Sequence, residues 1–362
     1  MSRFLALLLT ACLGFSGVAN ADEKMLVQRV GFSSMPGWAT DNHVEALDAF
    51  LRSCSDFDVR PDGAASGKDQ FLAPAIVWKR VCQKAYLIPA NDDPGARTFF
   101  EREFVPVKLT SDKNDHATLT GYYEPLLNGS RTKVRPYVYP VYGLPPQPLN
   151  VPRAKIDALG YLGGVAPVIV YVDDPVKLFF LHIQGSGIIK TSCGEVIHVG
   201  YAGNNSQPYV AIGKVMVDRG YIDKKDVSMQ SISAWLYAHP DQMWDIMWQN
   251  PSYIFFQELQ GGPYGSERAQ LTANRSLAVD SSYLPLGMPI YVATAVPRVG
   301  GASYTLFRKL MVAQDTGRAI TGPMRGDIYF GTGIDAEQVA GRMNAGGDFT
   351  LLVPQELYGK MH

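Results

Sequence analysis

The sequence predicts a mainly β protein with helices, in which two separate stretches of the chain supply the strands. Short β-rich runs separated by Pro- and Gly-rich turns begin at Ala117 and resume after Tyr253. Apolar residues at helical spacing occur before the first stretch and between the two. With 362 residues, 46% of them apolar and 19% charged, the chain is long enough for two hydrophobic cores.

The first residues have the pattern of a secretory signal peptide. A short basic start precedes an apolar run from Phe4 to Ala19, and Ala19-Asn20-Ala21 fits a small-x-small cleavage site. We therefore expect residues 1–21 to be removed and the mature protein to work in the periplasm. An alternative stays open, in which Leu9-Thr10-Ala11-Cys12 is a lipoprotein signal and Cys12 anchors the protein to the outer membrane.

Composition limits the class of partner. The formal net charge is -1, from 33 Lys plus Arg and 34 Asp plus Glu. This balance gives no electrostatic footprint for nucleic acid, so a neutral or mixed-charge partner is expected. Aromatic residues make up 11% of the chain, and exposed rings can stack on the apolar faces of sugars.

Helices are expected in the N-terminal part, where two of the cysteines lie. Cys54 ends an amphipathic stretch over 43–54, and Cys82 lies in a second stretch over 75–87. A disulfide between them would join two helices in an oxidising periplasm, and a buried free thiol is the alternative. Cys193 has no evident partner. The chain has no Cys-x-x-Cys or His-x-x-x-His cluster, so we expect no metal and no cofactor.

The rest of the chain divides into strands and a few helices by the same criteria. We expect strands at 118–123, 137–142, 168–172, 177–183, 276–279, 288–295, 304–313 and 349–353. Helices are expected at 210–219, at 229–248 with a break at His239-Pro240, and at about 336–343. The last helix could end on Gly346 or Gly347, with Asp335 as its N-cap.

Three aspartates near the C-terminus lie where apolar strands meet Gly-rich turns: Asp280, Asp315 and Asp327. Acids at strand ends beside glycines can approach a bulky ligand closely, because the missing side chains leave room. An Asp beside Gly is more often a turn former that caps its own backbone. No single one of these aspartates therefore indicates a ligand site, and only the three together do.

Two earlier segments, 120–125 and 182–187, are expected to form the other wall of the same site. Gln184 and Ser186 offer neutral hydrogen-bond groups to hydroxyl or acetamido groups. His182 alternates with apolar residues and is expected to be a satisfied strand histidine rather than a catalytic base. No helix pattern follows Gly185-Ser186-Gly187 and no Gly-x-Ser-x-Gly elbow is present, which disfavours a dinucleotide loop and a serine hydrolase.

Five blocks of sequence, taken together, resemble the membrane-bound lytic transglycosylase A family with its three-aspartate motif. The blocks occur in order at 120–125, 178–187, 250–256, 311–317 and 327–331. The resemblance implies a double-psi β-barrel domain formed by both chain ends, over 22–125 and 251–362. It also implies a small β-barrel domain inserted at 126–250, with a glycan groove between the two. Arg318 departs from the small residue that many relatives carry after Gly317.

The same resemblance implies a peptidoglycan lytic transglycosylase that acts on glycan strands, as a monomer or within cell-wall synthesis or division complexes. Asp327 matches the catalytic aspartate, and Asp315 and Asp280 match the two supporting acids. The expected substrate-binding residues are Thr120, Tyr122, Tyr123, Glu124, Gln184, Gly185, Ser186, Tyr253, Gly317, Tyr329 and Gly331.

One carboxyl group can suffice for this reaction, because the C6 hydroxyl of the muramic acid ring is an internal nucleophile. The Asp must first carry a proton, which requires partial burial or a nearby negative charge. We expect Ile328, Tyr329 and Phe330 to provide an apolar wall. Asp315 either adds like charge or fixes the Asp327 rotamer by a hydrogen bond, and the sequence does not choose between these.

Two alternative functions stay open. Double-psi barrels also occur in wall-loosening proteins without hydrolytic activity, so a non-catalytic wall-binding module is possible on the fold alone. A two-carboxylate glycosidase, in which Asp315 or Glu124 acts with Asp327, is the other alternative.

Overall fold

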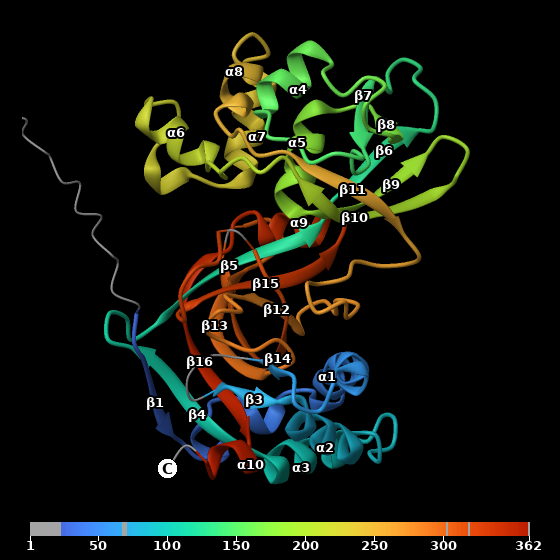
Figure 1. Ribbon diagram of the computed structural model, residues 1–362. Helices are drawn as coiled ribbons and strands as arrows, with labels where there is room; N and C mark the ends of the chain where they lie inside the picture. Colours follow the sequence, from blue (N-terminus) through green and yellow to red (C-terminus); the bar gives the residue numbers. More distant parts are fainter. Residues whose placement is uncertain (1–22, 67–70, 302, 318, 361–362) are drawn as a thin grey trace, which may run out of the picture.

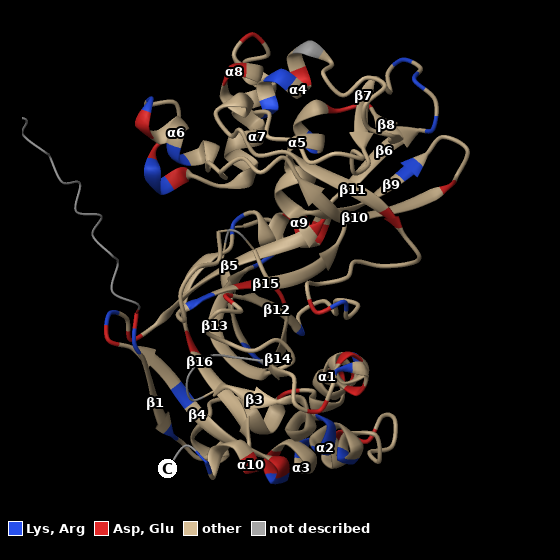
Figure 2. Ribbon diagram, in the orientation of Figure 1, with Lys and Arg blue, Asp and Glu red and all other residues tan. Residues whose placement is uncertain are grey.

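The computed structural model describes residues 23–66, 71–301, 303–317 and 319–360. The expected signal peptide, Cys12 and Arg318 lie outside the described residues. Figure 1 shows two β-rich bodies joined end to end, with α1, α2 and α3 packed at the far end of the first. Charged residues of both signs are interspersed over both bodies (Figure 2). None of the helices described is long and apolar enough to cross a membrane.

The N-terminal part contains three helices: α1 (His43–Val59), α2 (Ala75–Ala85) and α3 (Asp93–Glu103). Asn42 and Asp92 cap α1 and α3 by accepting hydrogen bonds from backbone N–H groups in the first turn. A disulfide joins Cys54 in α1 to Cys82 in α2 across a Cα–Cα distance of 5.6 Å, which is the pairing that the sequence suggested. Cys193 is free and exposed.

Six strands close the first barrel. Their order is β16 (Asn344–Pro354), β13 (Pro289–Pro297), β14 (Tyr304–Asp315), β12 (Ser276–Val279), β15 (Arg325–Thr332) and β5 (Ala117–Glu124), and β5 pairs with β16 to complete the circle. The β5–β15 and β12–β14 pairs are parallel. Outside β16, β4 (Phe104–Ser111) and β1 (Met25–Arg29) extend the sheet.

The second barrel starts one residue after β5. Its sheet has the order β11 (Ile254–Leu259), β10 (Val196–Asn204), β9 (Ser186–Thr191), β6 (Leu126–Ser130), β8 (Val168–Val172) and β7 (Tyr139–Tyr142), and a bridge between Gly143 and Phe256 joins its two edges. Its helices are α4 (Arg153–Leu159), α5 (Pro175–Gln184), α6 (Ile212–Asp218), α7 (Met229–Ala238) and α8 (Met243–Trp248). The expected class of fold, two β-barrels with helices, is confirmed.

Short elements complete the structure: β2 (Ala65–Ser66), β3 (Ala73–Pro74), α9 (Ile334–Ala340), α10 (Gln355–Tyr358) and the 3-10 turns Phe32–Ser34, Trp38–Thr40 and Lys224–Asp226. The helix α9 connects the two barrels. Gln230 in α7 donates from Nε2 to the Glu337 carbonyl at 3.0 Å, and the Met229 amide donates to the Gly341 carbonyl at 3.0 Å. These bonds place the inserted barrel over the β5 and β15 end of the first (Figure 1).

The expected strand at 177–183 is wrong, because this segment lies within helix α5. Asp174 caps the helix by accepting from the Val176 and Lys177 amides, and Pro175 occupies the first turn. Gly185 ends it in the left-handed conformation at φ 80°. The run between these signals is apolar throughout, so periodicity alone could not separate a buried helix from a buried strand.

The last helix also differs from expectation. Its N-cap is Gly333, and Asp335 lies inside the first turn. It ends at Ala340, whereas Gly346 and Gly347 belong to β16. A Cβ on Gly347 would lie 2.6 Å from the Leu119 side chain, so the absence of a side chain lets β16 pack closely where it closes the barrel against β5.

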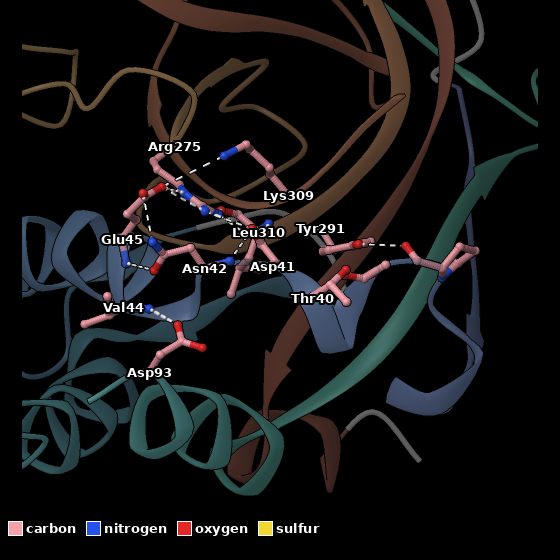
Figure 3. A network of polar contacts seen from close by, with 12 residues as sticks. Thr40, Asp41, Asn42, Val44, Glu45, Asp93, Arg275, Tyr291, Lys309 and Leu310 are labelled. Atoms are coloured by element: carbon pink, nitrogen blue, oxygen red, sulfur yellow. Dashed lines mark hydrogen bonds and ion pairs between the residues drawn. The ribbon is translucent and has the colours of Figure 1, made fainter. Parts of the chain in front are cut away.

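A buried ion pair ties the N-terminal helices to the first barrel (Figure 3). The Arg275 guanidinium, which is fully buried, donates to both Asp41 oxygens at 2.8 and 2.9 Å, and to the Leu310 carbonyl of β14 at 2.9 Å. Glu45 in α1 accepts a further bond at 3.0 Å. The Asp41 side chain is only 2% exposed, so its charge depends on Arg275 for compensation.

We expect Arg275→Ala to destabilise the protein by about 3–5 kcal/mol, because it leaves the Asp41 carboxylate buried without its cation, with only the Asn42 and Leu310 amides still donating to it. Urea unfolding of the purified protein measures this. Arg80→Ala is the matched control, since Arg80 forms a 2.8 Å ion pair with Glu356 on the surface, and about 0–1 kcal/mol is expected. Equal losses for the two variants would contradict the assignment.

Glu267 is a second buried acid beneath the barrel. It is 2% exposed, and its Oε2 accepts from Ser53 of α1 at 2.6 Å while Oε1 is buried without a partner among the described residues. Burial raises the pKa of Glu267 to about 8, with the Asp56 carboxylate adding to the rise and the Ser53 bond and Arg60 opposing it.

This raised pKa predicts that stability falls as pH rises. The folded protein holds the Glu267 proton up to about pH 8, whereas the unfolded chain releases it near 4.5, so stability is lost across that window. We expect Glu267→Gln to flatten the fall, by up to a few kcal/mol at pH 8 or above. The free energies of unfolding of wild type and Glu267→Gln, measured at pH 5 and at pH 9, check this. If both proteins lose the same stability between pH 5 and pH 9, the prediction is contradicted.

Candidate functional site

Strand register brings the proposed catalytic acid and one supporting acid into a single row. In β15, Asp327 pairs with Thr120 of β5 on one side and with Ala278 of β12 on the other. On the far side of β12, Ala278 pairs with Asp315 at the end of β14. Asp327 therefore lies within a strand, not in a Gly-rich turn as the sequence had suggested, and one residue separates it from Asp315 across the sheet.

Asp327 is held by one of its two carboxyl oxygens. Thr120 Oγ1 donates to Asp327 Oδ1, and Arg325 Nη1 lies 2.8 Å from the same oxygen. Arg325 Nη2 also donates to Thr120 Oγ1 at 2.7 Å, which closes a triangle. Across the described residues, Oδ2 has no hydrogen-bond partner, and the side chain is 20% exposed. The anchored oxygen thus fixes the carboxyl group while the other stays available to a ligand.

Two tyrosines share this face of the sheet. Tyr122 and Tyr329 pair across β5 and β15, with ring centroids 5.2 Å apart. Burial raises the pKa of Tyr122 well above its usual value, and the Asp315 charge raises it further, with a smaller contribution from Asp327. The phenol of Tyr122 is therefore neutral and lies in the field of both acids.

The expected apolar wall is only partly right. Tyr329 lies on the site face, but side chains alternate along a strand, so Ile328 and Phe330 point the other way. Ile328 is fully buried in the core of the first barrel, and Phe330 packs against that core. The charged neighbour that the structure adds is a cation, Arg325, which the sequence did not indicate.

The other two aspartates hold loops in place. Asp315 Oδ1 accepts from the Ser266 amide at 2.9 Å, the Ser266 hydroxyl at 2.9 Å and the Thr316 amide at 2.8 Å. Burial raises the pKa of Asp315, and these hydrogen bonds oppose the rise. Asp280 accepts from the Ser282 amide and hydroxyl at 3.0 and 2.6 Å, and from the Gly322 amide at 2.7 Å. Each carboxylate therefore fixes a turn beside the site.

Glu124 lies at the junction of the two barrels. It is 1% exposed, accepts from the Thr332 hydroxyl at 3.0 Å, and has His198 Nδ1 of β10 at 3.9 Å. Burial raises the pKa of Glu124. Its contacts are those of a buried residue that joins β5, β15 and β10.

The remaining candidates divide by position. Gln184 Oε1 accepts from the Tyr123 amide at 3.2 Å, which ties α5 to β5. Tyr123 points to the opposite face, where its hydroxyl contacts the Met229 sulfur at 3.6 Å. Gly185 is the left-handed cap of α5, Ser186 begins β9, Gly317 lies in the exposed loop after β14, and Gly331 has φ 97° within β15.

The structure does not bring Tyr253 to Asp327. Tyr253 is 1% exposed inside the second barrel, with its ring 4.2 Å from that of His182. His182 accepts from the buried Arg153 at 2.8 Å through Nδ1, and burial with the Arg153 charge lowers its pKa well below the usual value. These residues line a cavity of about 240 Å³ within the second barrel. His182 is thus neutral and helical, and has no evident catalytic role.

Tyr209 is a residue that sequence reasoning missed. It lies in the loop between β10 and α6, on the inserted barrel, and burial followed by the Asp327 charge raises its pKa. It reaches the field of Asp327 only because the inserted barrel docks on α9. No local pattern near Tyr209 signals this, and the expected glycan groove between the barrels stays a prediction.

Comparisons with known proteins agree with this geometry. The model described as "MltA specific insert domain" matches residues 118–257, and the "3D domain" matches residues 275–353. The chain is similar to the crystal structure of a membrane-bound lytic murein transglycosylase from Agrobacterium tumefaciens, at 30% identity and a TM-score of 0.83. That match covers 93% of this chain and 99% of the other. The chain belongs to the membrane-bound lytic murein transglycosylase A family.

Other members of the MltA family give the same result. A structure of MltA from Neisseria gonorrhoeae is 34% identical, with a TM-score of 0.77, and the match covers 91% of this chain and 93% of that one. Escherichia coli MltA with bound chitohexaose is 26% identical, with a TM-score of 0.71, over 92% and 95% of the two chains. The curated Escherichia coli K12 protein is 34% identical over 243 residues, and the match spans 65% of each chain.

The contacts of Asp315 predict how its substitutions differ. Asp315→Asn keeps an oxygen that can accept from Ser266 and Thr316, so we expect activity within about tenfold of wild type. Asp315→Ala removes the acceptor and frees the turn, and a displacement of about 1 Å at the site costs on the order of a hundredfold. Rates of glycan cleavage by both variants check this, and equal large losses would instead indicate that the charge itself is needed.

Proposed function

We propose that this chain is a peptidoglycan lytic transglycosylase in which Asp327 is the single general acid and base. It cleaves the β-1,4 bond between N-acetylmuramic acid and N-acetylglucosamine. Membership of the MltA family supports the reaction class. The observation that carries the assignment is the carboxyl group of Asp327, whose Oδ1 is held by Thr120 and Arg325 and whose Oδ2 has no hydrogen-bond partner in the described part of the chain.

In the first step, protonated Asp327 donates to the glycosidic oxygen. The C1–O bond breaks with its electron pair on that oxygen, and positive charge develops on the muramic acid ring. The N-acetylglucosamine side leaves with a free 4-hydroxyl group. Asp327 is left as a carboxylate, and Arg325 and Thr120 already provide the hydrogen bonds that stabilise this form.

In the second step, the C6 hydroxyl of the same muramic acid ring attacks C1. A lone pair on O6 forms the new C1–O6 bond, and the hydroxyl proton passes to the Asp327 carboxylate. The product is a 1,6-anhydro ring, the acid is regenerated, and no water is consumed. The nucleophile is already attached to the ring, so the entropic cost of bringing it to C1 is small.

The same relatives support the proposed substrate and bear on the location. Chitohexaose, a β-1,4 polymer of N-acetylglucosamine, binds the Escherichia coli MltA structure, which supports a glycan strand as the ligand. The curated relatives are named membrane-bound. That name agrees with the alternative of attachment to the outer membrane through Cys12, and the small-x-small site at Ala19-Asn20-Ala21 supports the periplasm, which is the location we propose.

A two-carboxylate mechanism has less support. Asp315 Oδ1 accepts three hydrogen bonds from Ser266 and Thr316. Glu124 is 1% exposed, and its Oε2 accepts from the Thr332 hydroxyl. Asp315 thus holds a turn and Glu124 is closed off from solvent, whereas the Asp327 side chain is 20% exposed, which favours Asp327 acting alone.

Product analysis with an Asp327→Asn variant tests the proposal. Wild type acting on purified sacculi should release 1,6-anhydromuramic acid products, and Asp327→Asn should lose at least about a thousandfold in rate, because an amide cannot transfer the proton. The Asn side chain has nearly the same shape, so thermal unfolding should be little changed.

Two results would contradict the proposal. Reducing-end products from the wild type would indicate a hydrolase. Unchanged biological activity in Asp327→Asn with sacculus binding retained would support the non-catalytic alternative. Sacculus binding by both proteins would separate loss of chemistry from loss of substrate.

A further inference from the structure

Arg325 is the one cation recorded in contact with Asp327 in the described part of the chain. Its side chain is 19% exposed, and it lies two residues before Asp327 on β15, so the two side chains share a face. Nη1 is 2.8 Å from Asp327 Oδ1, and Nη2 donates to Thr120 Oγ1 at 2.7 Å. The planar guanidinium thus holds both the acid and its hydroxyl partner.

The other titratable groups around Asp327 are neutral phenols or an acid. Tyr122 from β5, Tyr209 from the inserted barrel and Tyr329 from β15 all have raised pKa values, chiefly from burial. Asp315 from β14 is the nearest acid in the row. Among these described groups, Arg325 is therefore the one that brings a positive charge to Asp327.

The contacts also distinguish the two oxygens of the acid. Oδ1 accepts from the Thr120 hydroxyl and faces the guanidinium, so both neighbours present hydrogens to it. A proton on Oδ1 would meet these hydrogens, whereas Oδ2 has no such neighbour among the residues described. The transferable proton accordingly resides on Oδ2.

We propose that Arg325 is a positioning residue that controls the proton of Asp327, by fixing Oδ1, directing the proton to Oδ2 and stabilising the carboxylate formed during catalysis. This inference rests on the proposed role of Asp327. Arg325 promotes departure of the proton in the first step. Removing Arg325 should therefore favour the protonated acid over the carboxylate, because a cation at this distance stabilises the ionised form.

A purely structural role is the competing explanation. Arg325 Nη1 also donates to the Thr118 and Gly326 carbonyls, at 3.2 and 3.1 Å, and so joins β5 to β15. Loss of these bonds alone would lower activity equally at every pH. The pH dependence of the rate therefore separates the two explanations.

The experiment compares wild type, Arg325→Gln and Arg325→Lys by the rate of anhydro-product release from peptide-free glycan oligomers, between pH 4 and pH 9. For Arg325→Gln, we expect the alkaline fall in kcat to move up by about one pH unit or more, because the carboxylate loses its cation. The limiting rate should fall roughly three- to tenfold, since a weaker acid transfers its proton more slowly. Arg325→Lys should keep the wild-type position of the alkaline fall.

A uniform loss of rate with no movement of the alkaline fall would overturn the proposal. So would weaker binding of the glycan oligomer when Arg325→Gln is added to Asp327→Asn, because Arg325 would then be a substrate ligand. If Arg325→Gln does not fold, Thr120→Val serves instead. It removes a donor to Oδ1 and should move the alkaline fall in the same direction, and an unmoved fall would count against the proposal.

Two controls complete the design. Arg80→Gln breaks an ion pair of the same 2.8 Å length on the surface, and should change neither the rate nor the pH profile. Asp327→Asn alone should be inactive at every pH. Activity in that variant would refute the proposed function itself, independently of what the Arg325 variants show.

Discussion

The parallel pairing of β5 with β15 is the constraint on which the site depends. It joins residues about two hundred positions apart and sets three cross-strand pairs in register: Thr120 with Asp327, Tyr122 with Tyr329, and Glu124 with Thr332. Closure of the barrel through β5 and β16 fixes this pairing from the other side of β5. A slip of one residue would turn Asp327 into the barrel core, where no ligand could reach it.

Contacts with the N-terminal helices hold the strands that carry Asp315 and Ala278. Arg275 immediately precedes β12, and its guanidinium bonds both Asp41 and the Leu310 carbonyl of β14. Gln314, the neighbour of Asp315, donates to the Ala49 carbonyl and the Ser53 hydroxyl of α1. The helices thus hold β12 and β14 in the positions that put Ala278 between the two acids. Stability and site geometry are linked through these buried polar contacts.

Local sequence patterns predicted most of the helices and strands, but not which side chains they bring together. The two barrels, the split helix at His239-Pro240 and the three aspartates all follow from periodicity, turn residues and resemblance. The strand predicted at 177–183 is a helix, because a continuous apolar run shows neither the helical nor the strand periodicity. Asp174, Pro175 and Gly185 are the local signals that mark the helix. Arg325 and Tyr209 gain their meaning only from strand register and barrel docking, which no single segment of sequence encodes.

In the proposed mechanism, Asp327 takes part in two steps that need opposite protonation states. Donation to the glycosidic oxygen needs a protonated acid, whereas attack by the C6 hydroxyl needs a carboxylate. An entirely apolar pocket would serve the first step and oppose the second, and a fully paired carboxylate would do the reverse. In the proposed mechanism, Arg325 and Thr120 hold one oxygen of Asp327, and the other, which has no hydrogen-bond partner among the described residues, transfers the proton in both steps. In this proposal the C6 hydroxyl replaces the nucleophile that a second carboxylate would activate, and the cation that the sequence did not reveal stabilises the carboxylate form of the one acid that remains.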